Sequence, residues 1–237
     1  DLTSLISDQV AAVFVETPTN PLMQEIDLAA VAQLCQRHQT RLIVDNTFLT
    51  PLRQRPLELG ADLVIHSGTK YLTGHNDILA GVVVAKDASL GEQLVWLSNT
   101  TGPTLSPFDC WLFIRSLKTL SLRLDRQEAN AQALAQALSQ HPQIKEVLYP
   151  GRGAMMSIKI QDASKVDSFL RALKVFTFAE SLGGVESFIT YPTTQTHADI
   201  PQDIRESYGL TADLLRVSVG IEDPQDLIAD IIQALNA

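Results

Sequence analysis

The first part of the chain alternates short, uninterrupted apolar runs with amphipathic stretches. The apolar runs predict strands over residues 11–15, 42–44, 62–66 and 81–85. Between the first two, Asp27 precedes apolar residues at helical spacing, which predicts a capped helix to about residue 38, and a short helical turn is expected at 56–59. Continuous apolar strands joined by helices favour an α/β fold with a mainly parallel sheet covered on both faces.

The second part of the chain begins with a long helical pattern. Ser106 and Pro107 suit a helix start, and apolar residues at helical spacing continue to about residue 140, which we interpret as a connection between domains. Beyond it, the pattern predicts strands over 145–149, 155–160 and 215–219 and helices over 163–173, 203–208 and 226–235. Short strands alternating with helices in this way predict a smaller α+β domain.

Composition narrows the classes of partner. The 237 residues carry a net charge of −9 without a cluster of Lys and Arg, which opposes binding to nucleic acid or anionic membranes and favours a small molecule or another subunit. No apolar run suits a membrane span, and no secretory signal begins the chain, so we expect a cytoplasmic protein. Cys35 and Cys110 lack the spacing of metal ligands, and we expect two buried free thiols and no metal site. The pair Met155 and Met156 is expected in the core.

Polar residues follow three of the predicted strands. Asn20 lies in the loop after the first strand, Asp45 ends the second, and Lys70 lies just beyond the third. Because ligands of open α/β sheets bind beyond the carboxyl ends of strands, these side chains are expected to converge on one site. A carboxylate can hold a protonated pyridine nitrogen, a desolvated lysine can bond an aldehyde, and an amide can donate to a phenolic oxygen. These are the requirements of pyridoxal phosphate, and Ser67 and Thr69 add hydroxyls suited to its phosphate; the plainer alternative is a surface lysine after a strand.

Four motifs then match a family. They are ETPTNP at 16–21, VDNTF at 44–48, HSGTKY at 66–71 followed by Gly74 and His75, and SLGGVES at 181–187. In this order and spacing they resemble the Cys/Met-metabolism group of pyridoxal-phosphate enzymes, which includes cystathionine γ-synthase, cystathionine γ-lyase, cystathionine β-lyase and sulfhydrylases. The resemblance extends over essentially the whole chain.

The resemblance implies a fold type I, aminotransferase-like architecture. Residues 1–127 would form the C-terminal part of the large cofactor-binding domain with the connecting helix, and residues 128–237 the small C-terminal domain. It also implies an amino-acid substrate and a homotetramer built from dimers.

The resemblance assigns roles to the strand-end residues. Lys70 would hold pyridoxal 5'-phosphate covalently and shuttle protons, Asp45 would pair with the pyridine nitrogen, and Asn20 would contact the ring oxygen or the substrate carboxylate. Ser67 and Thr69 would bind the phosphate. The last part of the chain supplies the rest of the site.

Three residues of the small domain complete the implied site. Arg216 would grip the substrate α-carboxylate, and Ser181 would contact and orient the lysine and help to bind substrate. Glu180 matches a glutamate of members that act at the γ-carbon. His75 and His197 are weaker candidates for proton transfer, because the lysine can carry the protons itself, and His66 is expected to pack at a strand end.

Among the reactions of the family, Glu180 and the stretch 189–198 favour γ-replacement, as in a cystathionine γ-synthase or O-acylhomoserine sulfhydrylase. The alternatives are carbon–sulfur elimination by a γ- or β-lyase, or a non-catalytic remnant of the fold if the 237 residues are the complete protein. The family's N-terminal phosphate loop and its ring-stacking tyrosine have no counterpart in these residues, and a loop of the relatives is missing near Arg152 and Gly153. We therefore expect the 237 residues to belong to a longer protein.

Overall fold

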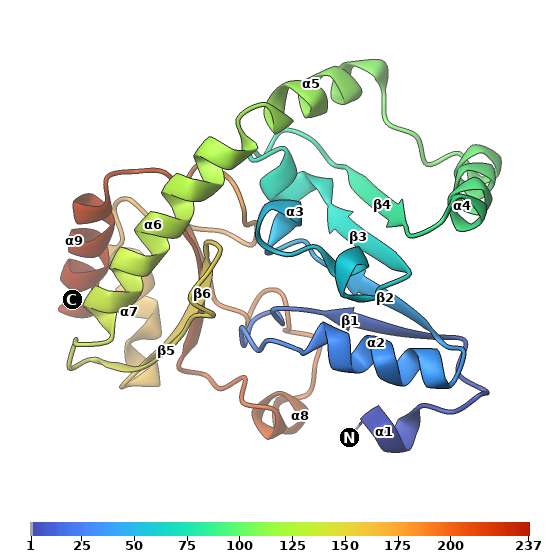
Figure 1. The fold of residues 1–237 in the computed structure, drawn as a ribbon. Coiled ribbons are helices and arrows are strands. Elements are labelled where there is room, and N and C mark those ends of the chain that lie inside the picture. The colour runs from blue at the N-terminus through green and yellow to red at the C-terminus, as the bar shows by residue number, and fades with distance from the viewer. Residues whose placement is uncertain (1) are drawn as a thin grey trace.

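A computed structural model describes residues 2–237, which form two β-sheets joined by a long helix (Figure 1). The first sheet has the order β1-β2-β3-β4, with strands Ala12–Glu16, Arg41–Asp45, Leu63–Ser67 and Gly81–Ala85. The second has the order β5-β6-β9-β8-β7, with β5 Ile144–Leu148, β6 Met155–Ile160, β7 Thr177–Phe178, β8 Phe188–Thr190 and β9 Leu214–Ser218. The predicted α/β class is therefore confirmed.

The first sheet is parallel from β1 to β3, and β4 joins β3 in the antiparallel sense, so the prediction of a mainly parallel sheet is confirmed. Helix α2 (Leu28–Arg37) covers one face, as Figure 1 shows. It begins at Asp27, whose side chain accepts a hydrogen bond of 3.0 Å from the backbone N–H of Ala30. Val13 and Val44 are buried under this helix, whereas Phe14, on the other face, is 59% exposed.

Short helical segments link the strands of the first sheet. They are α1 (Leu2–Leu5), α3 (Thr50–Arg53), the 3₁₀ turn η1 (Pro56–Leu59) and the wide turn η2 (Gly68–Leu72). The last follows β3 directly and carries Lys70, whose backbone dihedrals (φ −92°, ψ −127°) are not helical. The turn is therefore two short turns that meet at the lysine.

The long helix predicted to about residue 140 is instead two helices, α5 (Pro107–Leu117) and α6 (Leu120–Leu138). The break at Thr119 has a physical cause: the carbonyl of Ser116 accepts hydrogen bonds from the Thr119 backbone and from the buried guanidinium of Arg123, which compete with continued helical pairing. A further helix, α4 (Ala88–Thr101), had not been predicted.

The second sheet carries the larger apolar core. Helices α6, α7 (Val166–Ala172) and α9 (Pro224–Leu235) pack against it, and η3 (Ala163–Lys165) and α8 (Gln202–Ser207) lie in its connections. The predicted core position of Met155 and Met156 is confirmed, because both are almost fully buried. Strands β7 and β8 were missed; they are only two and three residues long, which is too short for a detectable pattern.

Helix α6 spans the boundary predicted between residues 127 and 128. Its first turns place Leu120 and Leu124 in a cluster with Tyr71, beside the first sheet. Its later turns place Leu134 and Leu138 in the core of the second sheet. One rigid helix thus fixes the two sheets relative to each other, as Figure 1 shows.

Cysteine burial was predicted correctly at one position and wrongly at the other. Cys35 in α2 is a buried free thiol, but Cys110 in α5 is an exposed free thiol. The physical reason is that α5 turns apolar side chains outward: Trp111 is 57% exposed and Ile114 62%. The apolar pattern of this helix therefore led to the wrong prediction that Cys110 is buried. In the described residues no helix has the length and apolar character of a membrane span.

The Asp230 side chain is a buried anchor whose loss is expected to destabilise the fold. Its carboxylate accepts hydrogen bonds of 2.8, 2.8 and 2.9 Å from the backbone N–H groups of Lys174, Val175 and Phe176. Asp230→Ala leaves these donors unpaired, so we expect the free energy of unfolding in urea to fall by about 2–4 kcal/mol. Asp226→Ala, at an exposed position of the same helix, should cost less than about 1 kcal/mol. Equal losses in the two variants would contradict this role for Asp230.

Candidate functional site

A cavity of about 670 Å³ lies where the ends of the first sheet's strands face the second sheet. Six of the eight predicted site residues line it: Asn20, Thr69, Lys70, Glu180, Ser181 and Arg216. They come from the loop after β1, the η2 turn, the segment before β8, and β9. The predicted convergence of distant residues on one cavity is thus observed for these six, while Asp45 and Ser67 lie outside its lining.

Lys70 lies one turn beyond the end of β3, as predicted. Its side chain is half-buried, and Nζ forms no hydrogen bond or ion pair with any of residues 2–237. Burial lowers the pKa of Lys70, and the nearby charge of Arg216 lowers it further. An amine that is unpaired and more easily deprotonated than usual is suited to bond an aldehyde.

The backbone around Lys70 is held from two sides. Arg123, which is buried in α6, donates hydrogen bonds of 2.8 Å to the carbonyl of Tyr71 and 3.2 Å to that of Leu72. On the other side, Gly183 has a φ of +78°, and a Cβ at this position would lie 2.7 Å from the Tyr71 nitrogen and 3.0 Å from the Lys70 carbonyl carbon. Only glycine permits this approach, so the motif at 181–187 fixes the lysine turn through its backbone.

Asp45 ends β2, as predicted, and is oriented by a residue that sequence reasoning missed. Its Oδ1 accepts hydrogen bonds from the backbone N–H of Thr47 (2.9 Å) and from the Thr47 hydroxyl (2.6 Å). The same hydroxyl oxygen accepts a hydrogen bond of 2.8 Å from the backbone N–H of Ser67. Thr47 therefore connects the two predicted residues outside the cavity lining, and it leaves Asp45 Oδ2 without a partner among residues 2–237. The motif VDNTF contained the signal that could have identified Thr47.

Thr69 has its hydroxyl engaged with the chain itself. Its Oγ1 accepts a hydrogen bond of 3.0 Å from the backbone N–H of Ala80 and donates 3.3 Å to the Ala80 carbonyl. Both bonds attach the lysine turn to the segment just before β4. The predicted phosphate contact of this hydroxyl would have to replace the bond that it donates.

Arg216 is the most deeply buried charge of the cavity, with only 2% of its surface exposed. The guanidinium donates to Asn20 Oδ1 (3.0 Å), the Glu180 carbonyl (2.6 Å), the Ser181 carbonyl (3.4 Å) and Thr190 Oγ1 (2.9 Å). All of these acceptors are neutral, and none of the ion pairs found in residues 2–237 includes Arg216. Burial lowers its pKa to about 10, so the group stays cationic at neutral pH. A buried cation without a counter-ion is suited to bind an anion.

The segment before β8 contributes mainly through its backbone. Glu180 provides a carbonyl to Arg216, while its own side chain is exposed beside the cavity. Ser181 Oγ lies 3.5 Å from Oδ1 of Asn76, a cavity residue that sequence reasoning missed, and no hydrogen bond from Ser181 to Lys70 is found. The predicted contact between this serine and the lysine therefore stays a prediction.

The three histidines occupy different environments. His75 is exposed, and its Nδ1 lies 2.6 Å from the Thr73 carbonyl, outside the cavity lining. His197 is half-buried; burial lowers its pKa, and Arg216 lowers it further. His66 is buried in β3, as expected for a packing residue. Of the two proton-transfer candidates, His197 is the one whose pKa is shifted by a charged residue of the site.

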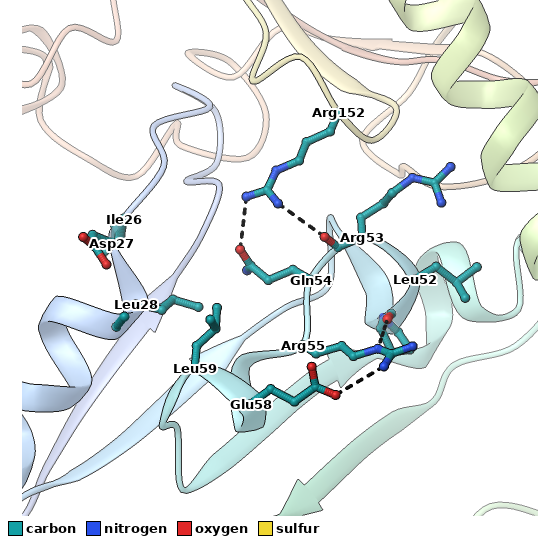
Figure 2. A pocket seen from close by; sticks show the side chains of 12 residues that line it. Ile26, Asp27, Leu28, Leu52, Arg53, Gln54, Arg55, Glu58, Leu59 and Arg152 are labelled. Atoms are coloured by element: carbon teal, nitrogen blue, oxygen red, sulfur yellow. Dashed lines mark hydrogen bonds and ion pairs between the residues drawn. The ribbon is translucent and has the colours of Figure 1, made fainter.

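A second cavity, of about 540 Å³, lies at the start of α2, next to α3 and η1 (Figure 2). Arg152 enters it from the turn between β5 and β6 and donates to Gln54 Oε1 (3.2 Å) and the Arg53 carbonyl (3.3 Å), as Figure 2 shows, and it also pairs with Glu25. Arg55 is paired with Glu58. Because its arginines are already paired, this cavity offers no free charge comparable to Arg216. No group of His, Cys, Asp and Glu suited to a metal ion is found in residues 2–237.

Comparisons with known proteins agree on one family. The model of the Cys/Met metabolism PLP-dependent enzymes matches residues 1–236. The chain is 56% identical over 229 residues to a cystathionine gamma-synthase of Haemophilus influenzae, covering 97% of this chain and 62% of that protein. It is 58% identical over 234 residues to a cystathionine gamma-synthase/O-acetylhomoserine (thiol)-lyase of Bacillus subtilis, covering 99% and 63%. The chain thus spans less than two thirds of the length of these relatives.

Solved structures give the same result. A cystathionine gamma-lyase of Lactobacillus plantarum complexed with L-serine superposes with a TM-score of 0.95 at 39% identity, covering 99% of this chain and 66% of that one. A cystathionine gamma synthase of Xanthomonas oryzae pv. oryzae, in complex with aminoacrylate and cysteine, superposes with a TM-score of 0.93 at 43% identity, covering 95% and 63%. A match over nearly the whole chain, in sequence and in structure, shows that the protein belongs to the Cys/Met metabolism PLP-dependent enzyme family.

Proposed function

We propose that the chain is part of a pyridoxal-phosphate enzyme of trans-sulfuration that catalyses γ-replacement, joining an O-acylhomoserine to a thiol such as cysteine. The observation that carries the proposal is that one cavity holds two cationic groups that form no ion pair: the buried guanidinium of Arg216 and the amine of Lys70. An amino acid presents a carboxylate for the first, and the aldehyde of pyridoxal phosphate suits the second.

The side chains present fit pyridoxal phosphate. Asp45 has one oxygen fixed by Thr47 and the other free, which suits an N–H of a pyridinium ring. Lys70 offers a free amine, Ser67 ends β3, and Asn20 lies in the loop after β1, at the same end of the sheet. When bound, pyridoxal phosphate supplies an electron sink that stabilises a carbanion next to the amino group of the substrate. Asp45, Asn20, Ser67, Thr69 and Lys70 are the residues that we assign to its binding.

The remaining residues act on the substrate. Arg216 binds the α-carboxylate with its planar fork, and Asn20 and Ser181 flank that position. Once its amine is released by the incoming substrate, Lys70 accepts the proton from the α-carbon and returns it, which its lowered pKa favours. Glu180 faces solvent at the rim, where the γ-substituent would leave.

Two observations favour γ-replacement over elimination. The γ-synthase relatives are 56–58% identical to this chain, whereas a cystathionine gamma-lyase of Bacillus subtilis is 46% identical and a cystathionine beta-lyase of Lactococcus lactis 41%. The two lyase alignments run over 246 and 251 residues, longer than the chain itself, so those proteins carry insertions that the two γ-synthases do not require. The short turn at Arg152 is consistent with that difference, and elimination by a γ- or β-lyase is the alternative function.

The wider expectations remain proposals. We assign residues 1–127 to the large domain and 128–237 to the small domain of a fold type I enzyme, with the boundary inside α6. A homotetramer built from dimers is supported by the outward apolar side chains of α4 and α5, among them Trp96, Phe108 and Trp111, which no other described segment covers. The cytoplasmic location stays a prediction.

Binding of pyridoxal phosphate is expected to produce a visible absorbance band in the purified protein. The band arises from the covalent bond to the Lys70 amine, so Lys70→Ala should abolish it. Lys118→Ala replaces an exposed lysine at the end of α5 and should leave the band unchanged. The absence of a band in the unmodified protein would favour the non-catalytic remnant, and a band that survives in Lys70→Ala would contradict the assignment of the lysine.

Product analysis is expected to show cystathionine when the protein is supplied with O-acetyl- or O-succinyl-homoserine and cysteine. With cystathionine alone, γ-elimination would instead release 2-oxobutyrate and cysteine, and β-elimination would release pyruvate and homocysteine. Chromatographic quantification of these products separates the three reactions. Faster release of either oxo acid than of cystathionine would replace the γ-synthase proposal by the lyase alternative.

Arg216→Lys is expected to raise KM for the acylhomoserine more than it lowers kcat. Lysine keeps the charge but loses the planar fork, so we expect kcat/KM to fall on the order of 100-fold. Arg171→Lys, which changes an exposed pair with Asp167 in α7, should have no effect on these constants. An unchanged KM in a folded Arg216→Lys protein would show that the carboxylate binds elsewhere.

A further inference from the structure

Glu16 is a second carboxylate beside the site that the proposed reaction does not use; like Asp45, it lies behind the residues that line the cavity. It is the last residue of β1, and its register partner in the parallel ladder is Asp45. Register partners of parallel strands project from the same face of the sheet, so both carboxylates point to the face opposite α2. Glu16 is half-buried, and its Oε1 is a buried atom that has no hydrogen-bond partner among residues 2–237.

Arg216 carries the complementary unsatisfied atom. Its Nε–H is buried and has no acceptor among the described residues, whereas Nη1 donates to Asn20 and Nη2 donates to three neutral oxygens. The charges of Glu16 and Arg216 act on each other: Arg216 lowers the pKa of Glu16, and Glu16 raises that of Arg216. An orphan donor on a buried cation and an orphan acceptor on a nearby carboxyl group therefore belong to one electrostatic unit.

The groups around Glu16 leave its charge finely balanced. Burial raises its pKa, as does Asp45 from β2, while the Asn20 backbone amide and Arg216 from β9 lower it; the net effect is a pKa of about 7. Lys70 and His197 also face Arg216 from the η2 turn and from the loop after β8, and the pKa of each is lowered there. Tyr71, whose pKa burial raises, stays neutral.

We propose that Glu16 is the internal counter-anion of Arg216 and a positioning residue for it: the carboxylate balances the guanidinium while the cavity holds no anion and is protonated from solvent when the carboxylate of a ligand takes its place. This inference rests on the proposed function and deepens it, because it describes how the same site admits an amino acid. No covalent bond changes; one proton passes from water to Glu16.

The sign of the pH dependence follows from the charges. Below about pH 7 Glu16 is already neutral, so an arriving carboxylate meets Arg216 without competition. Above that pH the ionised Glu16 must first take up a proton, so binding weakens as the pH rises. If the bound carboxylate raises the pKa of Glu16 from about 7 by one unit, the Kd rises by up to about tenfold between about pH 6 and pH 9, with a maximum uptake of roughly half a proton at about pH 7.5.

Calorimetry with butyrate tests the inference on the cofactor-loaded protein. Butyrate has the carboxylate and carbon chain of the substrate but no amino group, so it binds without reacting. Titrations in buffers of different ionisation enthalpy measure the protons taken up per butyrate. We expect uptake in the unmodified protein, none in Glu16→Gln, and a Kd in that variant that is independent of pH and close to the low-pH value of the unmodified protein. Glu58→Gln, at an exposed position outside the cavity, should behave as the unmodified protein.

The outcomes separate the inference from the proposed function. Butyrate binding that is weakened by Arg216→Lys but shows no proton uptake in the unmodified protein overturns the role of Glu16 and leaves the proposed function standing. Uptake that persists in Glu16→Gln also overturns it and assigns the proton to another group. Failure of the loaded protein to bind butyrate at any pH overturns both. Because the uptake is measured on the unmodified protein, the test does not depend on whether a variant folds.

Discussion

The buried guanidinium of Arg216 is the interaction on which the site depends. From β9 it reaches Asn20 in the loop after β1, the carbonyl of Glu180, and Thr190 on β8, and so joins the two sheets at the cavity. Each of these acceptors is neutral. The cost of burying a cation is therefore only partly offset by the protein, and the remainder is available to an anionic ligand. The same guanidinium therefore orders the site and, in the proposed function, binds the carboxylate of the substrate.

The position of the lysine depends equally on contacts between the two sheets. Arg123 and Gln127 extend from adjacent turns of α6: Arg123 holds the carbonyls of the lysine turn, and Gln127 donates 2.7 Å to the carbonyl of Gly184. The backbone N–H of Val185 donates a hydrogen bond of 3.0 Å to the Gly74 carbonyl, which also connects the segment before β8 to the end of the lysine turn. Movement of the second sheet would thus displace the lysine turn. The position of Lys70 therefore depends on the packing between the two sheets.

The ends of the parallel strands bring two acidic side chains close together. Glu16 and Asp45 end adjacent strands in register, and the charge of Asp45 contributes to raising the pKa of Glu16. Asp45 is fixed by Thr47, whereas Glu16 has a buried oxygen without a partner. We propose that this difference in hydrogen bonding suits Asp45 to hold the cofactor ring and Glu16 to respond to the charge in the cavity.

The sequence by itself determined all strands except the short β7 and β8, the strand-end placement of Asn20, Asp45 and Lys70, and the family, because apolar runs and contiguous motifs are local properties of the chain. It did not determine the break at Thr119 or the exposure of Cys110, since these depend on what packs against α5 and α6. Nor did it identify Thr47 or Glu16, whose roles follow from neighbours in other strands. That Arg216 forms hydrogen bonds only with neutral acceptors is likewise visible only in the folded chain, because these contacts join four separate segments. Local patterning fixes which residues are available; tertiary packing decides which of them are left unpaired, and those unpaired groups define the site.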